Sequence, residues 1–194
     1  MPESALLGFG GTRYIDSSMK PDFFLGDTKA IAQKLLGCQL HRRLPDGKIF
    51  SAQIAETEAY LGRRDPASHS FRGPTARNRS MFLEGGHFYV YLIYGMYHCL
   101  NVVTGPKDHG EAVLIRALKP LDGSAAILGP GRLCRELKID RSLDGSHFLH
   151  EGLWLSRGKT PRRIERAPRI GLNERLGPCV SWKLRFYLPG HSTR

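Results

Sequence analysis

The chain has 194 residues, of which 41% are hydrophobic and 24% are charged, a balance typical of a soluble globular protein. No apolar run approaches the roughly 20 residues that a membrane-spanning helix needs, so we expect no such span. Lys and Arg total 29 against 18 Asp and Glu, so the formal net charge is +11 at pH 7. This excess favours a polyanionic partner, but ribosomal proteins, membrane-surface proteins and basic enzymes share it, so motifs must decide among them.

The length fits one compact domain, and Gly and Pro are spread along the chain rather than gathered in a linker. Repeats and low-complexity tracts are absent from the sequence. We therefore expect a single domain over residues 21–194. Residues 1–20 carry charged side chains around a very short apolar patch, which lacks the apolar core of a signal peptide, and we expect a loose arm there.

Four cysteines are present, at Cys38, Cys99, Cys134 and Cys179. They stand far apart and form no C-x-x-C pair, so the sequence predicts neither a disulfide framework nor a zinc site. A reducing cytoplasm suits such thiols best. We expect the protein in the cytoplasm, associated with the nucleoid if its source is bacterial.

The first elements follow from capping and turn residues. A helix is expected over residues 28–36, because Asp27 can cap its first turn and Gly37 can end it. Strands are expected over residues 38–44 and 49–57, joined by a Pro-Asp-Gly turn. This pair predicts a hairpin.

A long loop rich in Gly, Pro and Arg covers residues 61–86 and contains His69. A loop of this length is more often functional than a simple connection. Aromatic and β-branched residues then fill 88–94 and 97–103, on either side of Gly95. This pattern predicts a second hairpin.

Beyond the second hairpin we expect a strand over residues 111–118, a short helix over 131–137 after a Gly-Pro-Gly turn, and a last strand near 184–188. The elements together predict a mixed α/β (α+β) fold. We expect one compact domain with a curved antiparallel sheet, surrounded by helices, and a protruding β-hairpin.

Two carboxylates end the second strand. The period of two residues in a strand places Glu56, Glu58 and Tyr60 on one face, where neighbouring carboxylates can shift a pKa toward that of a general base. The alternative is an edge strand with solvated glutamates, and by themselves these residues favour that simpler interpretation.

The turn of the second hairpin is unusual, because Tyr94 and Met96 place large apolar side chains where polar residues normally occur. One interpretation is a wedge that enters duplex DNA and fills the gap left by an extruded nucleotide. The other is a tip that folds back onto the core. A regular strand would direct Tyr91 to the face opposite Tyr94.

Several ordered sequence runs resemble the alkyladenine (3-methyladenine, methylpurine) DNA glycosylase family. The runs are IAETEAYLG (54–62), RNRSMF (77–82), YVYLIYGMY (89–97), CLN (99–101), VLIRAL (113–118), GPGRLC (129–134) and LRFY (184–187). The resemblance covers nearly the whole chain after residue 20. One departure is a shorter segment after residue 121, where the family usually has a longer helical stretch and only residues 122–128 remain here.

The resemblance implies specific roles. Glu58 corresponds to a general base and Arg116 to the residue that helps hold the attacking water. The other residues contact DNA or the base: Tyr60, His69 and Tyr91 stack on the flipped base, Asn101 senses the purine 2-position, Tyr94 intercalates, and Met96, Arg77, Arg79 and Arg132 are candidate DNA contacts.

The resemblance further implies a monofunctional base-excision-repair enzyme. It would flip alkylated or deaminated purines out of double-stranded DNA, hydrolyse the N-glycosidic bond with an activated water and leave an abasic site. It implies no metal, no cofactor and no lyase activity, and we expect a monomer. The alternative is a catalytically silent nucleic-acid-binding module, which explains the charge and the hairpin but leaves Glu58 and Arg116 without a purpose.

Overall fold

The computed structural model describes residues 19–193, so the predicted N-terminal arm falls almost entirely outside the described residues. The described part contains two α-helices, α1 (Thr28–Leu35) and α2 (Pro130–Glu136). Its strands are β1 (Gln39–Arg43), β2 (Ile49–Tyr60), β3 (Phe88–Ile93), β4 (Tyr97–Thr104), β5 (Glu111–Pro120), β6 (Ile127–Leu128), β7 (Leu149–His150), β8 (Leu153–Ser156), β9 (Glu165–Ala167) and β10 (Arg185–Tyr187). Short 3₁₀ helices occupy Pro21–Phe24, Gly62–Arg64, Arg79–Phe82, Arg141–Leu143 and Glu174–Ser181.

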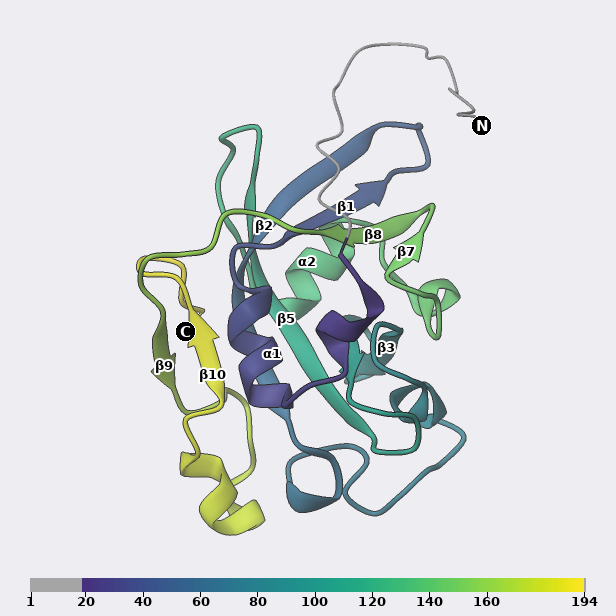
Figure 1. Cartoon of the computed structure of the whole chain (residues 1–194), viewed down its shortest axis with the longest axis vertical. Helices are drawn as coiled ribbons and strands as arrows, with labels where there is room; N and C mark the ends of the chain where they lie inside the picture. The colour runs from purple at the N-terminus through teal and green to yellow at the C-terminus, as the bar shows by residue number, and fades with distance from the viewer. Residues whose placement is uncertain (1–18, 194) are drawn as a thin grey trace, which may run out of the picture.

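The strands form one antiparallel sheet in the order β3-β4-β5-β2-β1-β8-β7, with β6 added to β5 and with β10 joining β2 to β9 (Figure 1). The long strand β2 is central, since it pairs with β5 on one side and with β1 and then β10 on the other. The mixed fold with a curved antiparallel sheet and few helices confirms the predicted fold class. In residues 19–193, no helix has both the length and the apolar character needed to cross a membrane.

Helix α1 forms as the sequence predicts. The Asp27 carboxylate accepts a hydrogen bond from the Ala30 amide at 2.8 Å, which satisfies one of the free N–H groups of the first turn. Ile31, Ala32 and Leu35 are buried against the sheet, and Gly37 leaves the helix with a φ of +88°. The helix therefore covers β2 and β5, the two strands that carry the predicted catalytic residues.

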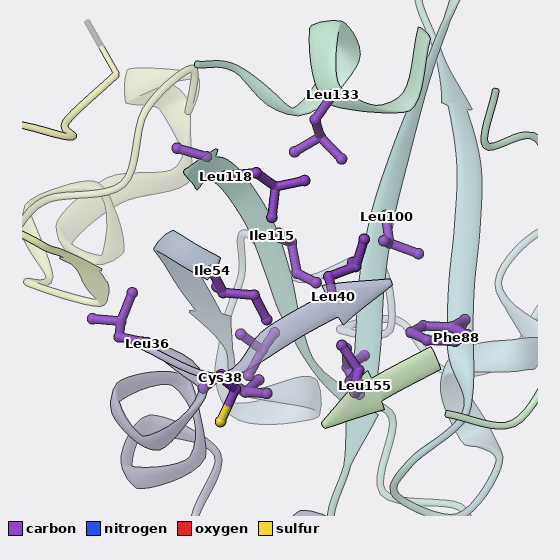
Figure 2. Close-up of a cluster of buried hydrophobic side chains, with 14 of the residues drawn as sticks. Leu36, Cys38, Leu40, Ile54, Phe88, Leu100, Ile115, Leu118, Leu133 and Leu155 are labelled. Carbon is purple, nitrogen blue, oxygen red and sulfur yellow. The ribbon is translucent and has the colours of Figure 1, made fainter. Parts of the chain in front are cut away.

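The period of two residues divides the strands into two faces. One face holds the main hydrophobic core, which includes Leu40, Ile54, Leu100, Ile115 and Leu133 (Figure 2). Each large apolar side chain buried in this way contributes roughly 1.5–3 kcal/mol to folding. The opposite face holds a smaller apolar cluster of Met81, Phe82, Tyr89, Val103 and Ala112. On this second face, polar side chains can form a site beside the smaller apolar cluster.

Four short strands lie outside the sequence prediction. Strands β6, β7 and β9 have two or three residues each, and β8 has four, so none carries a readable periodicity. Residues 122–128, the shortened segment, form a turn that ends in β6, where Leu128 pairs with Ala117. All four cysteines are buried, and each is a free thiol.

Candidate active site

A cavity of about 370 Å³ opens on the face of the sheet opposite the main core. Its volume lies near the lower end of the range for small-molecule sites, roughly 300–1,000 Å³. The residues that line it come from strands β2 to β5, the loop 61–86, the start of α2 and the segment 170–172. They include Tyr60, Ala67, His69, Met81, Tyr89, Tyr91, Tyr94, Cys99, Asn101, Leu114, Arg116, Pro130, Gly131 and Ile170.

The register between β2 and β5 aims Arg116 at this site. Ala117 pairs with Glu56 and Ile115 with Thr57, so the pairing passes over Arg116. A register shift of this kind changes the direction of the side chain relative to that in a regular strand. The Arg116 Nη1 atom lies 3.3 Å from Glu58 Oε2, and both side chains are buried. The structure thus brings together the two residues to which the resemblance assigns catalytic roles.

Glu58 is fully buried, which contradicts the solvated edge strand that these residues by themselves favoured. Its Oε2 accepts a hydrogen bond from the Tyr60 hydroxyl at 2.9 Å, and its Oε1 accepts one from the Ile170 amide at 2.8 Å. Burial raises the pKa of Glu58 above its ordinary value, while Arg116, the Ile170 amide and the Tyr60 hydroxyl lower it and Glu56 raises it. A carboxylate with a raised pKa can act as a general base nearer neutral pH.

Glu58 does not line the cavity itself, but its partners Tyr60, Arg116 and Ile170 do. A carboxylate can accept about four hydrogen bonds. Among the described residues, Tyr60, Ile170 and Arg116 contact its two oxygens, so acceptor capacity remains for a water molecule.

Aromatic rings form two walls of the cavity. His69 meets Tyr91 edge to face with ring centroids 4.5 Å apart, and its Nδ1 lies 3.0 Å from the Tyr89 hydroxyl. Burial against these rings, aided by the charge of Arg77, lowers the pKa of His69, which favours the neutral imidazole. Tyr60 forms the other wall, at the end of β2, and the Arg169 guanidinium lies over its ring, 4.7 Å from the ring centre.

Arg169 was not singled out from the sequence, although it organises this wall. Its guanidinium forms a fully buried ion pair with Asp65 and donates to the Ala59 carbonyl at 3.0 Å. Asp65 in turn accepts a hydrogen bond from the Leu61 amide. The pair therefore joins the loop after β2 to the segment that supplies the Ile170 amide. Only a Pro-Arg-Ile-Gly run within an arginine-rich stretch marks it in the sequence, which is a weak signal.

Asn101 lies on β4 and is 4% exposed at the cavity wall. Its Nδ2 donates to the Tyr89 carbonyl at 3.0 Å, so the amide is held in place. Tyr89 pairs with Asn101 across the hairpin. Asn101 therefore presents a fixed polar group at the wall of the cavity.

The tip of the hairpin projects its apolar side chains. Tyr94 is 80% exposed and Met96 is 66% exposed, so this tip does not fold back onto the core. Tyr94 lies beyond the end of β3 with a φ of +53°, and its side chain reaches the rim of the cavity that Tyr91 also lines. The expectation that Tyr91 and Tyr94 point to opposite faces applies to a regular strand, and Tyr94 lies outside β3 in a left-handed turn, so the strand alternation does not extend to it.

The predicted arginine contacts stand on the surface. Arg77 and Arg79 are exposed, and Arg77 donates to the Leu92 carbonyl at 2.9 Å, which ties the loop to the hairpin. Arg132 is exposed on α2 and pairs with Glu136 at 2.6 Å. All three belong to segments that border the cavity, as a role in holding a polyanion would require.

Comparison with known proteins identifies the family. The family model described as methylpurine-DNA glycosylase (MPG) matches residues 22–192. A Bdellovibrio bacteriovorus protein named putative 3-methyladenine DNA glycosylase is 43% identical over 183 residues, which cover 88% of this chain and 94% of that protein. The mouse DNA-3-methyladenine glycosylase is 39% identical over 198 residues, which cover 88% of this chain and 59% of the mouse protein. The chain belongs to the methylpurine-DNA glycosylase family of DNA repair glycosylases.

Proposed function

We propose that this protein flips alkylated or deaminated purines, of the 3-methyladenine, 7-methylguanine and hypoxanthine type, out of double-stranded DNA and hydrolyses their N-glycosidic bond. The observation that carries this proposal is the buried Glu58–Arg116 pair beside an aromatic cavity of single-base size. A nucleic-acid-binding module without catalytic activity does not need a carboxylate that is buried away from water, and burying such a group costs free energy.

Glu58 acts as the general base. It accepts a proton from a water molecule while Arg116 holds that water against C1′ of the sugar. The bond between C1′ and the purine nitrogen breaks with its electron pair leaving on the base, and the water oxygen bonds to C1′. The sugar resembles an oxocarbenium ion in the transition state, which the Glu58 carboxylate also stabilises.

The aromatic walls hold the flipped base. Tyr60, His69 and Tyr91 stack on it, and a purine alkylated at N3 or N7 gains further attraction because it is cationic. A neutral His69 suits this role, since an imidazolium would repel such a base. Asn101 crowds the purine 2-position and disfavours guanine.

The hairpin supports the flipped state. Extruding a nucleotide costs a few kcal/mol, and less when the base pair is damaged. Tyr94 offsets part of this cost by stacking in the gap, with Met96 beside it, while Arg77, Arg79 and Arg132 contact phosphates.

We also propose that the product is an intact abasic site. A lyase step needs an amine nucleophile that forms a Schiff base with the sugar, and the residues that line the described cavity include no lysine. The proposed enzyme works as a monomer in the cytoplasm, at the nucleoid of a bacterial source.

Incubating excess protein with duplexes that contain hypoxanthine or 3-methyladenine, with and without EDTA, tests the function. We expect release of free base in both conditions and strand cleavage only after alkali treatment. Binding without release would favour the silent module, strand cleavage that EDTA abolishes would indicate a nuclease, and cleavage without alkali would indicate a lyase.

A further inference from the structure

A second buried carboxylate, Glu56, stands behind the proposed catalytic pair and has no part in the mechanism above. It is fully buried and lies two residues before Glu58 on β2. A buried carboxylate is expensive unless it is paired and hydrogen-bonded. Its partners therefore indicate what it does.

Both oxygens of Glu56 bind groups on the last described segment. Arg185 Nη1 donates to Oε1 at 2.7 Å, and the Thr193 amide donates to Oε2 at 2.9 Å. Arg185 Nη1 also lies 3.0 Å from the Ser192 hydroxyl and 3.3 Å from the Thr193 carbonyl. Glu56 and Arg185 thereby hold residues 192–193 against the back of the site.

Arg116 touches this network on the side away from the cavity. Its Nε donates to the Thr193 hydroxyl at 3.3 Å and lies 4.0 Å from Glu56 Oε1. Its Nη1 faces Glu58 from the same guanidinium. A planar guanidinium held at Nε has little freedom to turn, so contacts at one edge decide where the other edge points.

We propose, on the basis of the function proposed above, that Glu56 and Thr193 are positioning residues, which lock the Arg116 guanidinium so that its Nη1 edge stays on Glu58 and the attacking water. Arg185 supports both of them. Two carboxylates and two guanidinium groups then balance in charge, which lets the network remain buried.

This geometry distinguishes Glu56 from a reserve general base. Glu58 contacts three residues that line the cavity, Tyr60, Arg116 and Ile170. Both oxygens of Glu56 instead accept hydrogen bonds from Arg185 and Thr193, which do not line it. A water that reached C1′ from the cavity would meet Arg116 and Tyr60 before Glu56. The carboxylate acts through Arg116 rather than on the substrate.

The pKa of Glu58 reports the position of Arg116. Arg116 lowers this pKa more strongly than Glu56 raises it. A Glu56 variant that lets Arg116 move away from Glu58 should therefore raise the pKa of Glu58, even though it also removes the charge of Glu56. The titratable and charged groups that face Glu58 are Glu56 and Tyr60 on β2, Tyr91 on β3, Cys99 on β4, Arg116 on β5, Arg169 before Ile170, and Arg185 on β10. None of these except Arg116 contacts Thr193 through the hydroxyl that a Thr193 variant changes.

The test compares Thr193→Val with Thr193→Ser. Valine keeps the shape and the backbone amide but removes the hydroxyl, and we expect the single-turnover rate to fall roughly tenfold with KM unchanged. The rise of the rate with pH should move to higher pH. Serine restores the hydroxyl and should restore both the rate and the pH profile. A merely structural role would not move the profile.

Glu56→Gln provides the second arm. We expect a larger loss of rate, again with an upward shift of the pH profile, whereas a simple charge effect would shift the profile downward. Glu111→Gln is the matched control, because it removes another glutamate–arginine pair of the same sheet, with Arg64 at 2.9 Å, away from the cavity. Its rate should equal that of the parent.

The pKa of Glu58 is also measured directly, from its carboxyl ¹³C chemical shift in labelled protein. This readout separates the two proposals, because it needs no activity. A parent protein that releases no base refutes the proposed function, while a raised Glu58 pKa in Thr193→Val still supports the positioning network. An unchanged Glu58 pKa in Thr193→Val, or a downward shift in Glu56→Gln, overturns the inference.

Discussion

Glu58 shows how a single residue acquires chemical character from its surroundings. Burial disfavours its charged form, while an arginine, an amide and a hydroxyl stabilise that form. The balance leaves the pKa raised but keeps the carboxylate oriented by three contacts. Such opposing influences are typical of catalytic groups.

Replacing Glu58 by Gln should keep the shape of the site and remove the base. We expect excision to fall by about 10²–10⁴-fold, the usual size of general-base effects. Affinity for lesion-containing DNA should survive, because Glu58 does not border the cavity. Single-turnover excision and a binding titration measure the two quantities. Near-parent excision would place the base elsewhere.

The raised pKa of Glu58 also predicts the pH dependence of the reaction. A general base works when deprotonated, so the single-turnover rate should rise with pH through a range above 4.5, the ordinary value. Because the folded-state pKa is raised, the contribution of Glu58 to folding stability is present at low pH and is lost as pH rises through that pKa. A rate profile measured across acidic and neutral pH checks this, and the residual rate of Glu58→Gln should lack the same limb.

The selectivity role proposed for Asn101 also belongs to the residue scale. Hypoxanthine and guanine differ by the 2-amino group, and a rigid buried amide can reject that group at a cost of a few kcal/mol. Asn101→Ala should therefore release undamaged guanine measurably, with smaller changes for 3-methyladenine. Single-turnover rates on matched duplexes with each base provide the comparison. If discrimination against guanine persists, Asn101 has no part in selectivity.

The β3–β4 hairpin is the element on which the proposed base flipping depends. The Met96 amide donates to the Ile93 carbonyl at 3.2 Å, so Tyr94 and Gly95 occupy the centre of a tight turn. Both have positive φ, +53° and +70°, as a type I′ turn requires. Glycine adopts this conformation freely, but a tyrosine there is disfavoured by roughly 1–2 kcal/mol. A strained, exposed aromatic at this tip is consistent with a functional requirement.

Replacing Tyr94 by Asn should separate stability from function. Asparagine tolerates the left-handed conformation, so we expect the free energy of unfolding to rise by up to about 1 kcal/mol. The lifetime of the flipped base should fall, most for well-paired lesions, because the side chain that fills the gap is removed. Denaturant unfolding and a lesion whose fluorescence changes on unstacking measure the two effects.

Met96→Ala is the control for the hairpin, since it trims the neighbouring exposed side chain and leaves the turn residues unchanged. It should affect flipping less than Tyr94→Asn does. If Tyr94→Asn flips and excises like the parent while Met96→Ala does not, then Met96 is the wedge.

At the scale of the whole molecule, we expect the net charge of +11 to dominate the encounter with DNA. Salt cations compete with Lys and Arg side chains for the phosphates, which lowers affinity for damaged and undamaged DNA alike. Raising salt from about 50 to about 200 mM should therefore weaken binding to both in parallel, with a steep log–log slope. A flat dependence would contradict a basic DNA-binding surface.

Single arginine variants locate that surface. Arg79→Gln and Arg132→Gln should each reduce the salt slope by about 1 if the side chain contacts a phosphate. Lys48→Gln is the matched control, because Lys48 is also exposed but precedes β2, at the opposite end of that strand from Tyr60. Its slope should equal that of the parent.

Local physical chemistry by itself determined the helix after Asp27, both hairpins and strand β5. Capping, turn residues and the period of two act within a few neighbours, so they are visible in the sequence. Long ordered runs around Glu58, Tyr91 and Arg116 determined the family, which the family match over residues 22–192 confirms. The roles assigned to those residues remain predictions.

Only the tertiary structure decided what surrounds these residues. The glutamates of β2 are compatible with a solvated edge in the sequence, and they are buried because β5 and β10 flank them from far along the chain. The offset register at Arg116, the Arg169 guanidinium over Tyr60 and the contacts of Glu56 with Arg185 and Thr193 arise in the same way. These partners are separated from β2 by about 60 to 140 residues, so their contacts depend on the closure of the whole sheet, which no local pattern encodes.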